Sequence, residues 1–161
     1  MAVRGSANPV AGPYFDFSVP EPTGVVAVLA PQGSSLLGLV SVVAPAVVTG
    51  NTTVVLASER APLPAVTLSE VLATSDVPGG VVNILTGLTA EVAPWLASHM
   101  DVNAIDLAGA DAGSVVELEV AAADNLKRVL RPLGDDWTRT PGTQRLFAHL
   151  ETKTVWHPIG I

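Results

Sequence analysis

The sequence predicts a doubly wound α/β fold, a Rossmann-like parallel sheet with helices on both faces. Two observations support this prediction: short apolar runs of strand length lack an alternating polar pattern, and longer helix-like segments separate them. Strands covered on both faces read as continuous apolar runs, and their alternation with helices is the pattern of βαβ units. A chain of 161 residues, 48% of them apolar, is also long enough to bury one core.

The N-terminal part of the chain differs from the rest in composition. Residues 1–13 are rich in Gly, Pro and Ala and show no periodicity, so we expect a flexible leader. The segment YFDFSVPEP (14–22) alternates large apolar with polar residues and ends in prolines, which is typical of an exposed or edge strand. Four buried strands are expected beyond it: VVAVLA (25–30), TVVLA (53–57), VVNILT (81–86) and NAIDLAG (103–109).

Four helices are expected to alternate with these strands. The first runs from about Leu36 to Val48 and is followed by Gly50 and Asn51, which both tolerate the positive φ common at helix ends. The stretch NLKRVLRPLGDDW (125–137) then passes from a charged helix end into a short apolar segment that Pro132 interrupts. The other helical segments are LPAVTLSEVLATSD (63–76), AEVAPWLASH (90–99) and SVVELEVAAADNLKR (114–128).

Composition excludes several classes of function. The chain carries 8 basic and 15 acidic residues, a net charge of −7, which opposes binding to nucleic acid or to an anionic membrane surface. The absence of cysteine excludes a disulfide framework, a thiolate metal site and a cysteine nucleophile. Histidines 99, 149 and 157 lie far apart without metal-ligand spacing, so we expect no metal site.

The apolar run at residues 25–48 raises the question of a membrane span. Pro31 and Gly33 interrupt it near the middle, and the pieces that remain have the lengths of one buried strand and one buried helix. The N-terminus also lacks the apolar core of a secretory signal. A cytoplasmic protein without membrane contact is the expectation.

A parallel sheet binds ligands at the carboxyl ends of its strands, which here lead into four loops. In the loop at 108–114, Gly109 and Gly113 could bring backbone N–H groups to a phosphate at a helix N-terminus. The alternative is that these glycines serve the turn itself, because glycine adopts turn conformations freely. Asp135 and Asp136 follow Gly134 and most simply form a polar turn.

Several phrases resemble the aldehyde dehydrogenase superfamily. PEPTGVVAVLAP, GNTTVVLASERAPL, DVPGGVVNILTGL, LASHMDVNAIDLAGA and AAADNLKRV follow the nucleotide-binding core of that family in order and at matching spacing, and LETKTVWHPIG is similar to its C-terminal strand. The resemblance implies a single domain after the leader, at residues 14–161. Its parts would be an oligomerisation strand (14–22), a truncated Rossmann-like core (23–133), a connector (134–148) and an oligomerisation tail (149–161).

The resemblance also implies that catalytic residues are lost. In the family, the segment with the cysteine nucleophile lies between the NLKRV helix and the C-terminal strand, where this chain has only GDDWTRTPGTQRLFA (134–148). The family's general-base glutamate aligns with Pro132, which cannot transfer a proton, and its oxyanion-stabilising asparagine aligns with Gly33. We therefore expect no catalytic residue in this chain and no activity from the chain by itself.

The cofactor contacts implied by the resemblance are reduced as well. The family holds the adenosine ribose with a lysine and a glutamate, and the lysine position is Leu56 whereas Glu59 remains. The serine expected after Gly109 is Ala110. Glu59 and Gly109 are thus the candidate vestigial cofactor-binding residues, with NAD binding weak and no tightly bound cofactor. The alternative for Glu59 is a solvated loop carboxylate, because acidic side chains are mostly exposed.

The two flanking strands resemble the family's oligomerisation module, and the helical segment 114–128 resembles one that packs across its dimer axis. The candidate interface residues are Tyr14, Phe15, Phe17, Lys153, Val155 and Trp156. We expect a catalytically inactive, structural or regulatory subunit that pairs with a full-length aldehyde dehydrogenase subunit or with itself. The alternative is a weak NAD(H)-sensing module. A third idea, new chemistry at Asp135, Asp136 or His149, lacks a paired base and nucleophile.

Overall fold

Five parallel strands form the central sheet of the computed structural model, which describes residues 3–160. Their order is β5–β4–β3–β6–β7, so the chain starts in the middle, runs to one edge, and then returns past β3 to the other edge. This is the order 3-2-1-4-5 of a doubly wound nucleotide-binding sheet, which reverses between β3 and β6. The strands are β3 (Val25–Leu29), β4 (Thr52–Leu56), β5 (Val82–Leu85), β6 (Ala104–Asp106) and β7 (Arg128–Leu130).

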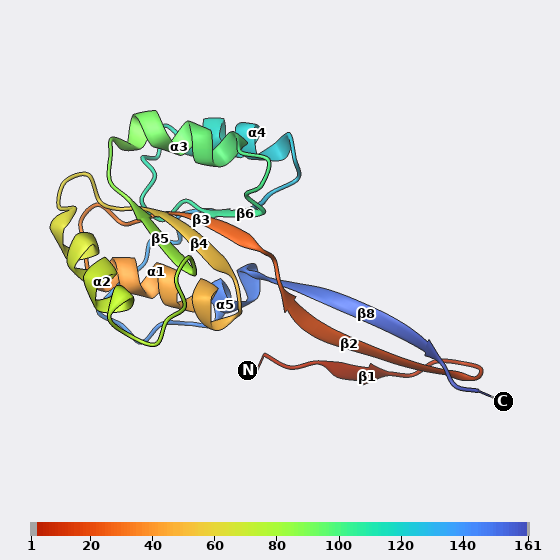
Figure 1. Ribbon diagram of the computed structural model, residues 1–161. Coiled ribbons are helices and arrows are strands. Elements are labelled where there is room, and N and C mark those ends of the chain that lie inside the picture. Colours follow the sequence, from red (N-terminus) through yellow and green to blue (C-terminus); the bar gives the residue numbers. More distant parts are fainter. Residues whose placement is uncertain (1–2, 161) are drawn as a thin grey trace.

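Helices cover both faces of this sheet, as predicted (Figure 1). One face carries α1 (Leu37–Val48) and α2 (Leu63–Ala73), together with a short helix, α5 (Gln144–Ala148), that packs against α1. The opposite face carries α3 (Thr89–Ser98) and α4 (Val115–Ala123), which pack side by side. None of the helices within residues 3–160 has the length and apolar character needed to cross a bilayer.

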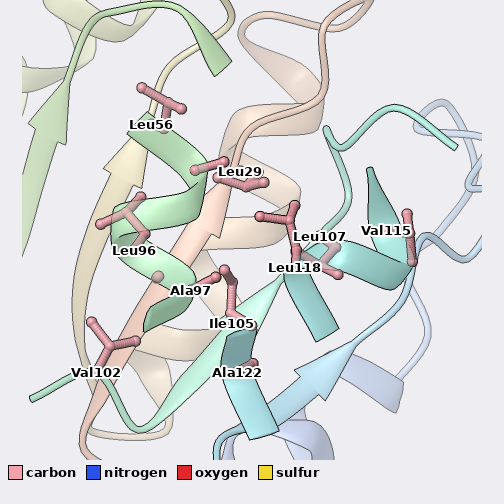
Figure 2. Close-up of a cluster of buried hydrophobic side chains, with 12 residues drawn as sticks. Leu29, Leu56, Leu96, Ala97, Val102, Ile105, Leu107, Val115, Leu118 and Ala122 are labelled. Carbon is pink, nitrogen blue, oxygen red and sulfur yellow. The ribbon is translucent and has the colours of Figure 1, made fainter. Parts of the chain in front are cut away.

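The two faces of β3 explain why its sequence does not alternate. Ala27 and Leu29 belong to the apolar cluster under α3 and α4, which Figure 2 shows. Val26 and Val28 belong to the second cluster, under α1. All four side chains are almost completely buried, so each position favours an apolar residue. The doubly wound prediction is confirmed.

Helices α1 and α4 are both followed by a residue with positive φ. Gly50, with φ of +90°, follows α1, and the N–H groups of Gly50 and Asn51 donate to Val47 and Ala46, which is a Schellman arrangement. The prediction for Gly50 is confirmed. After α4 the corresponding position is Leu126, with φ of +57°. The helix expected to reach residue 128 therefore ends at Ala123, because the chain reverses at Leu126 to enter β7.

Three antiparallel strands form an arm that projects from the body (Figure 1). They are β1 (Ser6–Asn8), β2 (Tyr14–Pro22) and β8 (Leu150–Pro158), in the order β1–β2–β8. Two predictions need correction here. Part of the expected leader forms β1, because Ser6–Asn8 pair with β2. The segment 14–22 is the middle strand of the arm rather than an edge strand, while β8 lies at an edge.

Candidate functional site

The loops after β3, β4 and β5 are held together at the carboxyl edge of the sheet by polar contacts around Gln32. The hydroxyl of Ser58 donates to the carbonyl oxygen of Gln32 at 3.1 Å, and the backbone N–H of Glu59 donates to Oε1 of Gln32 at 3.0 Å. Oε2 of Glu59 in turn accepts the backbone N–H of Thr89 at 2.7 Å. These hydrogen bonds link the three loops to one another.

The carboxylate of Glu59 caps the N-terminus of helix α3. Thr89 is the first residue of α3, and the preceding residue, Leu88, has no side chain that could cap the helix. The carboxylate of Glu59 takes that place, and the hydrogen bond from the backbone of Thr89 lowers the pKa of Glu59. The structure thus gives Glu59 a structural partner, whereas its role in holding a cofactor stays a prediction.

Gly109 lies where the strand order reverses, between the ends of β3 and β6. Its N–H donates to the carbonyl oxygen of Leu29 at 2.8 Å. A Cβ at this position would lie 2.0 Å from the carbonyl oxygen of Ala30, so no other residue fits without moving the backbone. This geometry favours the structural role of Gly109, because the N–H that a phosphate would need already has a partner. Its contact with a cofactor stays a prediction.

A buried charge cluster joins the connector to the end of β6. Nε of Arg145 donates to Oδ2 of Asp106 at 2.8 Å, and another guanidinium nitrogen donates to Asp135 at 2.9 Å. The guanidinium also lies 5.2 Å from the ring centre of Trp137. Asp106 is 0% exposed, and this burial raises the pKa of its carboxyl group while Arg145 opposes the shift.

This cluster was not predicted from the sequence, although the acid in the apolar run NAIDLAG was a signal. A carboxylate inside a buried strand needs a charged partner, but the sequence does not say which of the distant basic residues supplies it. Of the expected polar turn, Asp136 does accept the N–H and hydroxyl groups of Thr138. Asp135 instead pairs with Arg145.

A pocket of about 350 Å³ lies between α1 and the connector. Its walls include Ser41 and Pro45 from α1, and the connector residues Asp136, Trp137 and Arg139. Within residues 3–160, no group of three His, Cys, Asp or Glu side chains lies close enough together to hold a metal ion.

The root of the arm is fixed by Asn51. Its side-chain amide nitrogen donates to the carbonyl oxygen of His149 at 2.9 Å, and its side-chain oxygen accepts the N–H of Gly24 at 2.8 Å. The N–H of Thr23 also donates to the carbonyl oxygen of His149 at 3.2 Å. Thr23 and His149 are the points where the arm strands β2 and β8 leave the body. Asn51 therefore ties both roots of the arm to the end of α1.

The strand register places unlike side chains on the two faces of the arm. Phe17 pairs with Ala7 on one side and Val155 on the other, so these three residues share a face. We call the apolar part of this face, which consists of Ala7, Phe15, Phe17, Val19 and Val155, the apolar arm face; Glu21, Glu151, Lys153 and His157 lie on the same side of the arm. The opposite face is polar over most of its length, with hydrogen bonds that join Ser6, Asn8, Asp16, Ser18 and Thr154.

The six predicted interface residues divide between these two faces. Phe15, Phe17 and Val155 lie on the apolar arm face, where the rings of Phe15 and Phe17 are 5.5 Å apart. Lys153 shares this face and pairs with Glu21 at 3.1 Å. The remaining two residues lie at the tip of the polar face, where the rings of Tyr14 and Trp156 meet edge to face at 5.9 Å and Trp156 is 60% exposed.

Comparison with known proteins assigns most of the chain to one family. The family model described as "Aldehyde dehydrogenase family" matches residues 2–135. The chain belongs to the aldehyde dehydrogenase family. It is 34% identical over 133 residues to aldehyde dehydrogenase, cytosolic 1 of Elephantulus edwardii, and 35% identical over 133 residues to human retinal dehydrogenase 2. These matches cover 82% of this chain and 26% of each relative.

Solved structures of aldehyde dehydrogenases support the same assignment. PnpE from Pseudomonas sp. WBC-3 superposes with a TM-score of 0.76 and 31% identity, over 80% of this chain and 26% of that chain. Betaine aldehyde dehydrogenase from Staphylococcus aureus, solved in complex with NAD+, has a TM-score of 0.74 and 26% identity, over 79% of this chain and 25% of its own. The chain thus spans about a quarter of the length of these aldehyde dehydrogenases.

Helix α4 of this aldehyde dehydrogenase-family chain also exposes apolar side chains. Val116 and Val120 lie one helical turn apart and are both exposed, and Leu126 follows them just beyond the helix end. Trp95 is exposed on the neighbouring helix α3. The correspondence of α4 to the family's dimer-axis helix stays a prediction, and these residues are where such a contact would form.

Proposed function

We propose that this chain is a non-catalytic aldehyde dehydrogenase-family subunit with a structural or regulatory role, which associates through its arm with a full-length aldehyde dehydrogenase subunit. The observation that supports this function best is the apolar arm face. Phe15 is exposed on it, and the arm strands pack chiefly against one another. A two-faced sheet in water keeps polar residues on its free face, so an apolar free face favours a partner.

The free edge of β8 adds a second mode of contact. Strand β8 pairs with β2 along nine residues and has no partner on its other side within residues 3–160. An exposed strand edge offers N–H and C=O groups to a strand of another chain, and the side chains at alternate positions then decide which chain fits. Both features lie on the arm, away from the body.

The lack of activity rests on the residues present. The 161 residues contain no cysteine, and the family resemblance aligns Pro132 with the general base and Gly33 with the oxyanion-stabilising asparagine. A proline cannot accept a proton, and a glycine has no side-chain donor. We therefore expect the pure chain not to oxidise aldehydes with NAD.

Three variants test the association. Phe15→Asp and Val155→Asp place a carboxylate on the apolar arm face, whereas Thr152→Asp places one on the exposed polar face of the same arm. Sedimentation of each variant with the full-length aldehyde dehydrogenase from the same cell measures complex formation. We expect at least about tenfold weaker association for the first two, because burial of an unpaired charge is costly, and no change for the third. Equal association of all variants would refute the role of the apolar face.

A weak NAD(H)-binding module is the second candidate, and the strand order that reverses between β3 and β6 favours it. The helix ends near that point have internal partners, however. The hydroxyl of Ser34 accepts the N–H of Gly38 at 2.9 Å in α1, and Glu59 accepts the N–H of Thr89 in α3. We expect a calorimetric titration with millimolar NAD to give little or no heat. Clear saturable heat would favour the second candidate.

A further inference from the structure

The pocket between α1 and the connector contains a charged group that its neighbours pair only in part. Arg145 lines this pocket and is 7% exposed. Its Nε donates to Asp106 and its Nη2 donates to Asp135. The third nitrogen of the guanidinium, Nη1, carries two further N–H donors and has no hydrogen-bond partner within residues 3–160.

Nη1 of Arg145 also keeps accessible surface. In the described part of the chain, the fully enclosed side-chain nitrogen and oxygen atoms without a partner all belong to Thr23 and His149. Nη1 is not one of them, so it is not fully enclosed. An accessible donor on a buried guanidinium can form a charge-assisted hydrogen bond with an acceptor group of a ligand in the pocket.

Two carboxylates on the pocket wall lie next to this donor. Oδ2 of Asp135 accepts the hydrogen bond from Arg145 at 2.9 Å, which leaves Oδ1 of Asp135 able to accept another. Asp136 follows in the chain and also lines the pocket. The hydroxyl and backbone N–H of Thr138 both donate to Oδ1 of Asp136, and they lower the pKa of this group, so Asp136 is ionised at neutral pH.

The charges around the pocket favour a ligand that carries both signs. The charge of Arg145 is already shared between Asp106 and Asp135. A ligand with a carboxylate alone would therefore add a negative charge beside three acidic side chains, including Asp136. A ligand with an ammonium group alone would leave Nη1 of Arg145 unpaired. A ligand with both groups can pair each of them.

We propose that this pocket binds a free α-amino acid as its zwitterion. The carboxylate accepts from Nη1 of Arg145, and the ammonium group donates to Asp135 and Asp136. Both charged groups of an α-amino acid branch from one carbon, which suits an arginine and an aspartate in direct contact. Pro45 and Trp137 give the apolar side chain a wall, and the volume of about 350 Å³ lies in the range of small-ligand sites.

This site lies between the body and the connector and does not use the arm. It therefore does not depend on the proposed association through the apolar arm face, and failure of either proposal leaves the other unaffected.

The test is an NMR titration of the ¹⁵N-labelled chain with L-valine, read at the indole N–H groups of the three tryptophans. We expect a saturable shift for Trp137, and none for Trp95 or Trp156, which are exposed elsewhere. Two analogues each lack one charged group: 3-methylbutanoate has no ammonium, and isobutylamine has no carboxylate. Each is expected to bind at least about tenfold more weakly than L-valine, because one charge-assisted hydrogen bond is lost.

Arg145→Lys keeps the positive charge beside Asp106 and removes Nη1, and is expected to weaken L-valine binding at least about tenfold. Asp136→Asn covers the case in which that variant does not fold. Asp136 is exposed, and asparagine keeps an oxygen for Thr138, so binding should weaken at least about fivefold without loss of the fold. The matched control is Asp111→Asn, an exposed acid outside the pocket, which is expected to leave binding unchanged.

Three results would overturn the proposal. The first is no shift of Trp137 up to the solubility limit of L-valine. The second is binding of 3-methylbutanoate or isobutylamine as tight as that of L-valine, since the pocket would then recognise one charge alone. The third is equal binding of L-valine by Asp136→Asn and Asp111→Asn.

Discussion

The side-chain amide of Asn51 donates to the carbonyl oxygen of His149 at 2.9 Å, across 98 residues of sequence. The same side chain accepts the N–H of Gly24 and donates to Ala46, so it joins the end of α1 to both roots of the arm. Asn51 is buried, and its removal would leave several buried polar groups without partners.

Asn51→Ala is therefore expected to lower the free energy of unfolding by about 2–4 kcal/mol, because each buried group that loses its partner costs about 1–3 kcal/mol. Denaturant unfolding measures this loss. Asn83→Ala is the matched control, since Asn83 also bonds to backbone oxygens but is exposed. An equal effect of the two variants would show that Asn51 does not fix the arm root.

The buried ring of His149 predicts a pH dependence of stability. Its pKa is about 4 in the folded chain and about 6.5 when unfolded, so the unfolded chain binds more protons between these values. The contribution of the neutral His149 ring to the free energy of unfolding is complete above pH 6.5 and is lost as the pH falls toward 4. Between pH 6.5 and pH 4, the free energy of unfolding of the parent chain is expected to fall by about 3 kcal/mol relative to that of His149→Phe. The measurement is denaturant unfolding of both proteins from pH 4 to 7. The same pH dependence of the free energy of unfolding in the two proteins would contradict this prediction.

The buried ion pair of Arg145 with Asp106 predicts that loss of the Arg145 charge strongly lowers the free energy of unfolding. Arg145→Leu leaves the fully buried carboxyl of Asp106 without a cation, and is expected to lower the free energy of unfolding by about 3–5 kcal/mol at neutral pH. Burial then raises the pKa of Asp106 with only the N–H of Ala108 opposing the shift, so the variant should regain stability relative to the parent chain as pH falls. The added change Asp106→Asn should restore part of the loss at neutral pH.

The control for this prediction is Arg131→Leu, which breaks an exposed ion pair with Glu119 and is expected to change stability much less. Denaturant unfolding at several pH values measures all of these variants. A small effect of Arg145→Leu at neutral pH would mean that the connector is not held to the sheet by this pair.

The left-handed backbone conformation of Leu126 predicts that substitution by glycine stabilises the chain. It has φ of +57° at the reversal after α4, and its side chain is 90% exposed, so glycine would relieve the backbone strain and lose little burial. Leu126→Gly is expected to raise the free energy of unfolding by about 0.5–1 kcal/mol, which is the cost of the left-handed conformation less the greater freedom of unfolded glycine. Leu133→Gly, outside the left-handed region, should not stabilise. A fall in stability for Leu126→Gly would show that its side chain makes contacts.

The alternation of strands and helices could be predicted from sequence because both faces of the sheet are covered. Every residue of β3 from Val26 to Leu29 meets one of two apolar layers, so the run leaves a clear pattern. Gly50 was likewise predictable, since the requirement for a positive φ is local to the end of α1.

The missed features depend on contacts between distant parts of the chain. β1 has too little apolar pattern to be recognised, and it forms because Ser6–Asn8 meet a partner strand. Helix α5 has only five residues and is positioned by the pair of Arg145 with Asp106, 39 residues earlier. The unpartnered ring of His149 carries no local signal either. Each of these depends on tertiary structure, which short-range patterns do not encode.

The most direct test of the central claim is native mass spectrometry of the particle that contains this chain, purified from its own cell at low salt. We predict a heteromer in which the chain accompanies a full-length, cysteine-bearing aldehyde dehydrogenase, and we predict that Phe15→Asp releases the chain while Thr152→Asp does not. A chain that is recovered alone, or that stays in the particle after Phe15→Asp, would contradict the account.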